Sequence, residues 1–172
     1  MSNLGYPDTA LPAHDNVARE DWQAAMEHYL SGLFLVVSPD AASNHRALES
    51  ACCSLVALNE AVAWVGPAPA GASAGPGTLH VYPSIAGALD DAGVDSVLAR
   101  VDAADSAAVR VLLDVAMQGT RVVLAVCASD AAAVFALWRR DHGPKLQGLE
   151  VTDAYAGAFN PVMDTFEADM PA

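Results

Sequence analysis

The sequence predicts an α/β domain, a three-layer sandwich in which helices cover both faces of a mostly parallel central sheet. Short apolar runs of strand length alternate along the chain with longer segments whose apolar residues recur at helical spacing. Hydrophobic residues make up 53% of the 172 residues and aromatic residues only 6%, so the core is built mainly from Ala, Val and Leu. That composition suits parallel strands that are buried on both faces, and the length favours one domain.

The predicted strands are apolar runs bounded by residues that favour turns. The first, LFLVV, contains no polar residue, as expected of a strand at the centre of a parallel sheet. The third, TLHVY, is expected at an edge of the sheet or in a hairpin. The predicted strands span residues 33–37, 61–65, 78–82, 96–101 and 121–126.

Most of the predicted helices carry an apolar stripe, and most begin near a residue that can cap them. Ser43 or Asn44 can cap the second helix and Ser84 the third, because their side-chain oxygens can accept from the first free backbone N–H groups. Gly119 is a natural stop for the fourth helix, and the Gly-Pro pair at 143–144 is expected to end the fifth. The predicted helices span residues 19–30, 44–59, 85–92, 105–118 and 131–140.

Three segments lie outside these elements. Residues 1–18 are expected to be a flexible N-terminal arm, and residues 66–77, composed of Gly, Pro, Ala and Ser, a loop or linker. The core then covers residues 19–143, and residues 144–172 form a C-terminal tail. In that tail a short helix is expected, which either docks on the core or binds a partner's groove. Its apolar face would carry Phe159, Val162, Met163 and Phe166.

Charge, hydropathy and the Cys and His residues exclude several classes of function. The formal net charge is −13 and only 8 residues are Lys or Arg, so nucleic acid is not an expected ligand. No apolar run reaches the length of a membrane span and the N-terminus lacks the pattern of a signal peptide, so we expect no membrane insertion and a cytoplasmic location. Three cysteines, Cys52, Cys53 and Cys127, form no disulfide framework, and the scattered histidines show no metal-ligand spacing.

The stretch GLFLVVSPDAASNHRALE, residues 32–49, is a strand, a turn of small and polar residues, and a helix. A phosphate-binding loop occupies such a turn in P-loop proteins, where it needs glycines, a lysine for the phosphates and a Ser or Thr for Mg²⁺. The turn here, from Ser38 to Arg46, contains neither Gly nor Lys. The strand, turn and helix of a nucleotide site are therefore present, but the glycines and the lysine that bind phosphate are not.

Several stretches resemble the ATPase core of the type II secretion and type IV pilus assembly family. REDWQAAMEHYLSGLFLVVSP is similar to the family's helix that leads through H-G-L-x-L-V-T-G-P into its Walker A loop, G-P-T-G-S-G-K-S-T. AVAWVGP lies where the family has the strand of its acidic box, V-E-D-P. VDSVLARVDAADSAAVRVLLDVAMQGTRVVLAVCASDA lies where the family has its Walker B and His-box segments, and Gly119, Asp130 and Ala131 match there.

The resemblance implies a P-loop NTPase fold of the RecA-like type over about residues 20–143. It also implies that the family's catalytic groups are lost. Asp102 alone remains near the Walker B acid, and an isolated Asp after a strand is also a common loop or helix-cap carboxylate. The matched acidic-box and His-box positions hold Val65, Gly66 and Cys127, and the vestigial nucleotide loop consists of Ser38, Asp40, Ser43, Asn44, His45 and Arg46.

These replacements predict no ATP hydrolysis, because phosphoryl transfer depends on charge stabilisation and positioning. We therefore expect a pseudo-ATPase without catalytic residues, cofactor or metal, which acts as a regulatory or structural module. By the resemblance, its partner would be a secretion or pilus ATPase or an inner-membrane platform component. The alternatives are a sensor that binds a nucleotide or anion without cleaving it, and an unrelated small α/β enzyme. We expect a monomer or dimer, since the family's N-terminal domain has no counterpart here.

Overall fold

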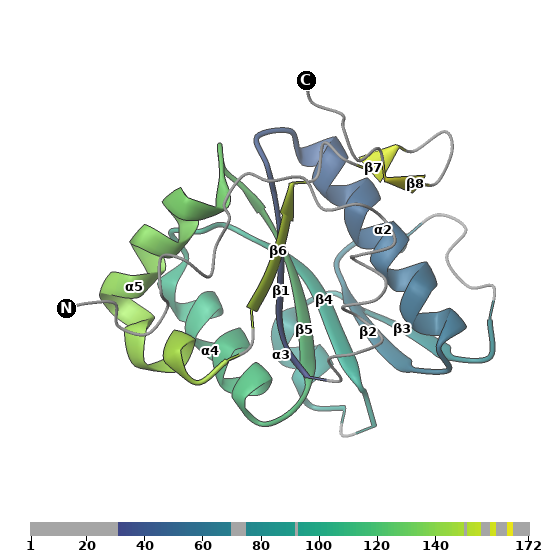
Figure 1. The fold of residues 1–172 in the computed structure, drawn as a ribbon. Helices are drawn as coiled ribbons and strands as arrows, with labels where there is room; N and C mark the ends of the chain where they lie inside the picture. Colours follow the sequence, from purple (N-terminus) through teal and green to yellow (C-terminus); the bar gives the residue numbers. More distant parts are fainter. Residues whose placement is uncertain are drawn as a thin grey trace.

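A computed structural model of the chain describes residues 31–69, 75–91, 93–149, 151–155, 159–160 and 165–166. The predicted arm at 1–18, the helix at 19–30, the middle of the loop at 66–77, and Val162 and Met163 lie outside these residues. Within the described part of the chain, helices flank an all-parallel six-stranded sheet, which confirms the predicted α/β sandwich (Figure 1). None of the described helices is long and apolar enough to cross a membrane.

The sheet has the strand order β3-β2-β4-β5-β1-β6. Neighbouring strands pair in parallel throughout, so all six carboxyl ends lie at one edge. The third predicted strand is indeed at an edge, where it pairs with β2 in parallel and not as a hairpin. The strands are β1 (Gly32–Ser38), β2 (Ala61–Val65), β3 (Thr78–Tyr82), β4 (Ser96–Val101), β5 (Arg121–Cys127) and β6 (Val151–Tyr155).

Two hydrophobic clusters, one on each face of the sheet, form the core. One joins α2 (Ala41–Ala57) to alternate residues of β1, β2, β4 and β5, among them Phe34, Trp64 and Leu98. The other joins the opposite residues of these strands to α3 (Ile85–Leu89), α4 (Ser106–Met117) and α5 (Ala131–Gln147). Figure 1 shows α2 on one side of the sheet and α4 and α5 on the other. Successive side chains of a strand point to opposite faces of the sheet, so each buried strand contributes alternate residues to the two clusters.

The second helix begins earlier than predicted. Asp40, not Ser43 or Asn44, is its N-cap, and its carboxylate accepts hydrogen bonds from the backbone N–H groups of Ala42 and Ser43. Helix α2 therefore begins at Ala41, and only Pro39 and Asp40 separate it from β1. The expected loop from Ser38 to Arg46 is thus a turn of two residues followed by helix.

The fifth helix does not end at the Gly-Pro pair. It continues to Gln147 through a kink at His142, whose backbone is not helical (φ −132°, ψ 21°). Pro144 falls in the first turn after the kink, where a missing N–H costs little. The core also extends past residue 143, because β6 pairs with β1 as a sixth strand.

The predicted short helix of the tail is wrong. Phe159–Asn160 (β7) and Thr165–Phe166 (β8) form a two-stranded antiparallel sheet in which Phe159 pairs with Phe166. In Figure 1 this hairpin lies beside the start of α2, and β7 contacts that helix. Two backbone segments paired in this way cannot present the helical face that Phe159 and Phe166 were expected to share.

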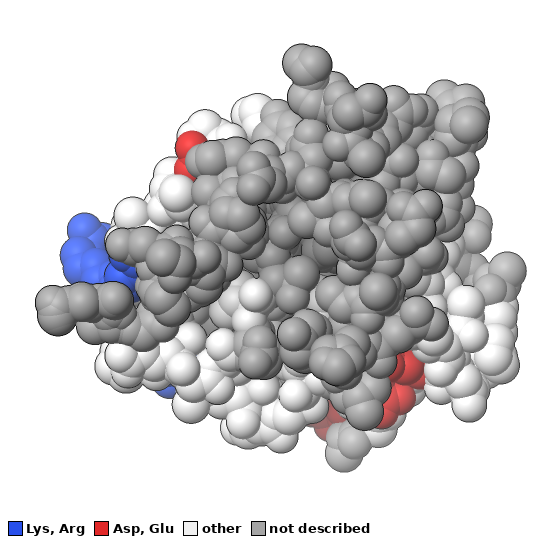
Figure 2. Space-filling view, in the orientation of Figure 1, with Lys and Arg blue, Asp and Glu red and all other residues white. Residues whose placement is uncertain are grey.

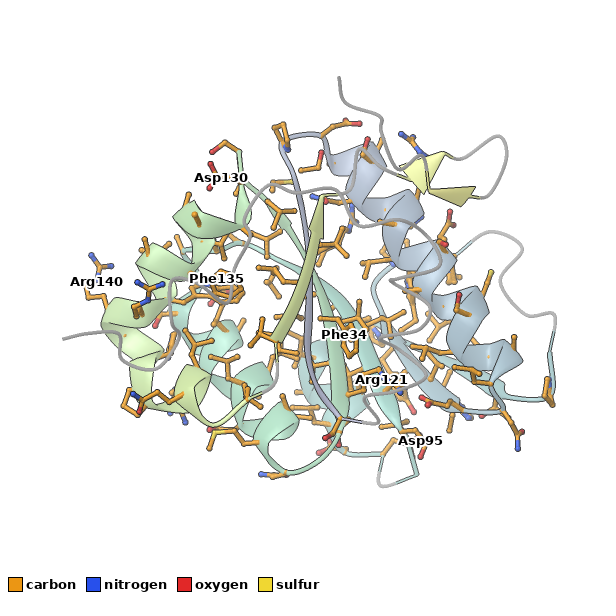
Figure 3. All side chains as sticks on the ribbon, in the orientation of Figure 1. Phe34, Asp95, Arg121, Asp130, Phe135 and Arg140 are labelled. Atoms are coloured by element: carbon orange, nitrogen blue, oxygen red, sulfur yellow. The ribbon has the colours of Figure 1, made fainter. Side chains whose placement is uncertain are left out.

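A buried ion pair joins the amino ends of β2, β4 and β5. Arg121 is fully buried, and its guanidinium donates to Glu60 Oε1 at 2.5 Å and to the Ser96 hydroxyl at 3.1 Å. The central carbon of the Arg121 guanidinium lies 5.9 Å from the centre of the Phe34 ring, and Figure 3 shows the two side chains next to each other. This cluster is at the edge of the sheet opposite the carboxyl ends.

Candidate functional site

The carboxyl ends of β1 and β5 form a topological switch point. Helix α2 leaves β1 along one face of the sheet, whereas α5 leaves the neighbouring β5 along the other. In open parallel sheets, ligands bind in the crevice that such diverging connections leave outside the strand ends. The strand, turn and helix singled out in the sequence lie at this point.

The N-terminus of α2 is occupied by the protein's own carboxylate. Besides the two backbone N–H groups, the Ser43 hydroxyl donates to Asp40 Oδ2 at 2.7 Å. The hydrogen bonds from Ser43 and Ala42, that of the Ser43 side chain foremost, lower the pKa of the Asp40 carboxyl. A helix N-terminus attracts phosphate through its free N–H groups and its positive dipole end. Here the Asp40 carboxylate accepts from two of these N–H groups, those of Ala42 and Ser43, so an incoming phosphate would meet a fixed negative charge.

The basic side chains of the first two turns of α2 contact other residues of the chain. His45 Nε2 lies 3.2 Å from Glu49 Oε2, and the His45 ring packs edge-on against Trp64. Arg46 donates to the Ser43 hydroxyl at 3.1 Å. These contacts hold both side chains along the helix.

Asn44 points inward from the first turn of α2 and is only 1% exposed. Its Nδ2 donates to the backbone carbonyl of Ser38 at 3.2 Å and approaches Cys127 Sγ at 3.4 Å. The Ser38 carbonyl fixes the orientation of the amide, since only the NH₂ group can face it. Asn44 Oδ1 is buried, and among the described residues it has no hydrogen-bond partner.

A cavity of about 470 Å³ lies between the first turn of α2 and the ends of β4 and β5. Three of the residues singled out in the sequence, Asn44, Asp102 and Cys127, meet in its lining, although they come from three separate parts of the chain. Val65, the last residue of β2, and Gly66, which follows it, are the matched acidic-box positions, and neither lines the cavity. The residues that line the cavity are Asn44, Arg100, Val101, Asp102, Ala125 and Cys127.

Asp102 is an exposed loop carboxylate at the cavity. Its Oδ1 accepts from the backbone N–H of Ala104 at 2.9 Å, and Asp105 beside it caps α4. Cys127 is also exposed. Arg100 was missed by the sequence interpretation. The signal available was a lone charge near the end of an otherwise apolar strand, SVLARV, and alternation places it on the same face as Leu98, towards α2.

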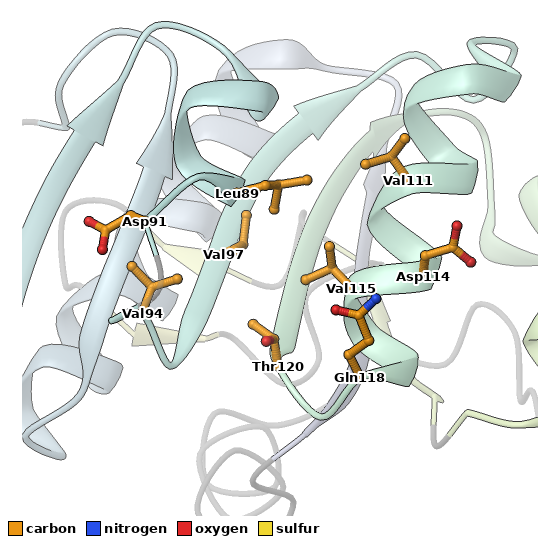
Figure 4. A pocket seen from close by; sticks show the side chains of 9 residues that line it. All are labelled: Leu89, Asp91, Val94, Val97, Val111, Asp114, Val115, Gln118 and Thr120. Carbon is orange, nitrogen blue, oxygen red and sulfur yellow. The ribbon is translucent and has the colours of Figure 1, made fainter.

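A second cavity of about 420 Å³ lies between α3 and α4 (Figure 4). Its walls combine apolar side chains, among them Leu89 and Val115, with polar ones, among them Gln118 and Thr120. Its two carboxylates contact other side chains, because Asp91 accepts from the Tyr82 hydroxyl and Asp114 pairs with Lys145. Among the described residues that line this cavity, no buried side-chain atom lacks a hydrogen-bond partner.

A serine and a histidine also meet away from the switch point. The Ser106 hydroxyl lies 3.2 Å from His142 Nε2, at the kink of α5. Burial lowers the pKa of His142. Within the described residues no carboxylate accepts a hydrogen bond from the other ring nitrogen, so the pair lacks the third group that orients a catalytic histidine. The same part of the chain holds no group of three His, Cys, Asp or Glu residues able to bind a metal ion.

No protein-family model matches the chain, and no curated protein is similar to it at a significant level. The site is therefore interpreted from its geometry.

Proposed function

We propose that this protein is a pseudo-ATPase, a non-catalytic module of the P-loop, RecA-like type that acts by binding other proteins. One observation carries the proposal. The Asp40 carboxylate caps α2 at the switch point, where a nucleotide-binding relative would present free N–H groups to phosphate. Mg²⁺ and phosphate chemistry would need a lysine, a Ser or Thr ligand and a long backbone loop, and the two-residue turn before α2 supplies none of them.

The surface offers protein partners charged regions of both signs. In Figure 2 the Lys and Arg side chains visible on this face gather over α5, where the Arg140 side chain is 71% exposed. The visible acidic side chains lie mostly at the opposite lower edge of the molecule, on the side where Figure 3 labels Asp95. Such separated charges steer the encounter of proteins more than they add affinity. By the family resemblance, the partner is a secretion or pilus ATPase or an inner-membrane platform component.

Calorimetric titration with Mg–ATP, together with a hydrolysis assay on the same sample, tests the proposal. We expect neither binding heat nor turnover. Turnover would overturn the proposal, and binding without turnover would favour the nucleotide sensor. Co-purification that recovers no component of a secretion or pilus machine would count against the proposed partner.

A variant tests the role assigned to Asp40. Asp40→Ser keeps a capping hydroxyl and removes the charge, so we expect it to gain measurable affinity for phosphate. Asp105→Ser is the matched control, because the Asp105 carboxylate also caps a helix, α4, but that helix follows β4 and not a strand of the switch point. Equal phosphate affinity in the two variants would contradict the argument.

A further inference from the structure

Strand β3 has a row of backbone hydrogen-bonding groups that no strand pairs with in the described part of the chain. On its inner side, the Thr78 N–H and the Tyr82 carbonyl form hydrogen bonds of 3.0 and 2.8 Å with the residues that flank β2. Alternate residues of a paired strand direct these groups to opposite sides. The N–H and C=O groups of Leu79 and Val81 therefore point away from β2, at the outer edge of the sheet (Figure 1).

The sequence of β3 lacks the devices that usually protect an exposed edge. Natural proteins block such edges with charged side chains, with proline or with a bulge. TLHVY contains no Lys, Arg, Asp, Glu or Pro, and its residues pair with those of β2 one to one, without a bulge. The Val81 side chain is also 45% exposed. An unprotected edge of this kind is a template for pairing with another strand.

The strand is complementary to itself. If two copies meet antiparallel with His80 opposite His80, Leu79 of each copy lies opposite Val81 of the other, and each such pair exchanges both of its N–H···O=C hydrogen bonds. Leu79 and Val81 then form an apolar pair on the face of α2, and Thr78 and Tyr82 a β-branched–aromatic pair on the other face. Other registers that keep the outward groups facing each other pair at most three of the five residues.

We propose that two copies of this chain associate through their β3 strands, which pair antiparallel about a two-fold axis at His80 and join the two sheets into one. Such a contact is closed, because each copy uses the edge that the other needs, so association stops at the dimer. The strand contains no Asp, Glu, Lys or Arg, so the net charge of −13 on each chain places no carboxylates opposite each other along it. The inference goes beyond the pseudo-ATPase proposal and does not rest on it.

Sedimentation equilibrium of the full chain tests the association. A contact along five residues is small, so we expect a Kd on the order of 10 μM and a mass that rises towards that of two chains between about 1 and 500 μM. The mass of one chain throughout this range would overturn the proposal.

Two variants of Val81 test whether the edge of β3 forms the contact. Val81→Lys adds a protecting charge and should weaken dimerisation at least about tenfold, since the change occurs twice in a symmetric contact. Val81→Pro removes an outward N–H and leaves the bonds to β2, so it should give a folded monomer. Met117→Lys is the matched control, because Met117 is 50% exposed at the end of α4. A dimer of unchanged affinity in Val81→Lys, or equal weakening in the control, would refute the contact.

Cysteine cross-linking tests the register, in a Cys127→Ser background that removes the exposed native thiol. His80→Cys places two thiols opposite each other in a non-hydrogen-bonded pair, where Cα atoms about 4.5 Å apart can form a disulfide. Thr78→Cys is exposed on the same face, but its two copies lie four residues apart along the paired strands, about 13 Å, too far for a disulfide. Oxidation should link His80→Cys and spare Thr78→Cys, and any other pattern would overturn the proposal. Mg–ATP titrated into the same samples reports on the pseudo-ATPase proposal alone.

Discussion

Replacing Glu60 with alanine should destabilise the protein far more than the loss of an exposed charge. Glu60 Oε1 lies 2.5 Å from the guanidinium of Arg121, and the Arg121 side chain is 0% exposed, against 15% for Glu60. Removing one partner of a buried pair costs about 3–5 kcal/mol, since the other charge stays in a poorly solvated place. For a chain of this length the loss corresponds to a fall in Tm of about 6–20 °C.

Urea denaturation of the wild type and of Glu60→Ala measures this loss directly. Asp141→Ala is the matched control, because it breaks a pair whose side chains are 71% and 43% exposed, and should cost at most about 1 kcal/mol. Arg121→Met in the Glu60→Ala background should cost less than it does alone, because the two residues interact. A loss below about 1 kcal/mol for Glu60→Ala, or strict additivity of the two changes, would refute the reasoning.

Three further predictions follow from buried groups. Burial lowers the pKa of His142 below 6.5, so the unfolded chain binds a proton that the folded protein does not, and stability should fall as the pH drops below about 6.5. Urea titrations from pH 8 to 5 should show this fall, and His142→Gln should flatten it; an unchanged profile would contradict the assignment. Burial raises the pKa of Cys52 to about 12, so alkylation of the native protein, mapped by mass spectrometry, should modify exposed Cys127 and spare Cys52. Labelling of Cys52 at the rate of Cys127 would be inconsistent with its burial. Trp138→Phe removes the indole hydrogen bond to the Ala103 carbonyl inside the core and should cost about 1–3 kcal/mol by calorimetry, whereas a neutral effect would show that this bond contributes nothing.

Much of the fold was predictable because the central strands are unambiguous apolar runs. The predicted segments 61–65 and 96–101 coincide with β2 and β4, and Gly119 follows the last turn of α4 with φ +103°, as a helix stop should. Strand β6 was missed because VTDAY mixes polar and apolar residues, and its position depends on pairing with β1. Local sequence carries little of that information.

The candidate site was predicted in part. The sequence identified Asn44, Asp102 and Cys127, and the parallel sheet brings them together at one edge. It placed the cap of α2 at Ser43 or Asn44, because Asp40 was interpreted as a charge in a loop. Asp, Ser and Asn are all good caps, so sequence alone does not choose among them. Arg100 was missed because its role depends on which face of β4 it occupies.

The position of β1 in the sheet has a consequence for how the chain reaches this fold. β1 is the first described strand, yet its neighbours are β5 and β6, and Gly32 pairs with Arg121. During synthesis this very apolar strand leaves the ribosome long before either neighbour exists. Parallel pairing over such separations is slow and leaves strand edges exposed to aggregation. Helix α2 packs on β1 directly after it in the chain, so it is the segment available to cover one face of the strand during that interval.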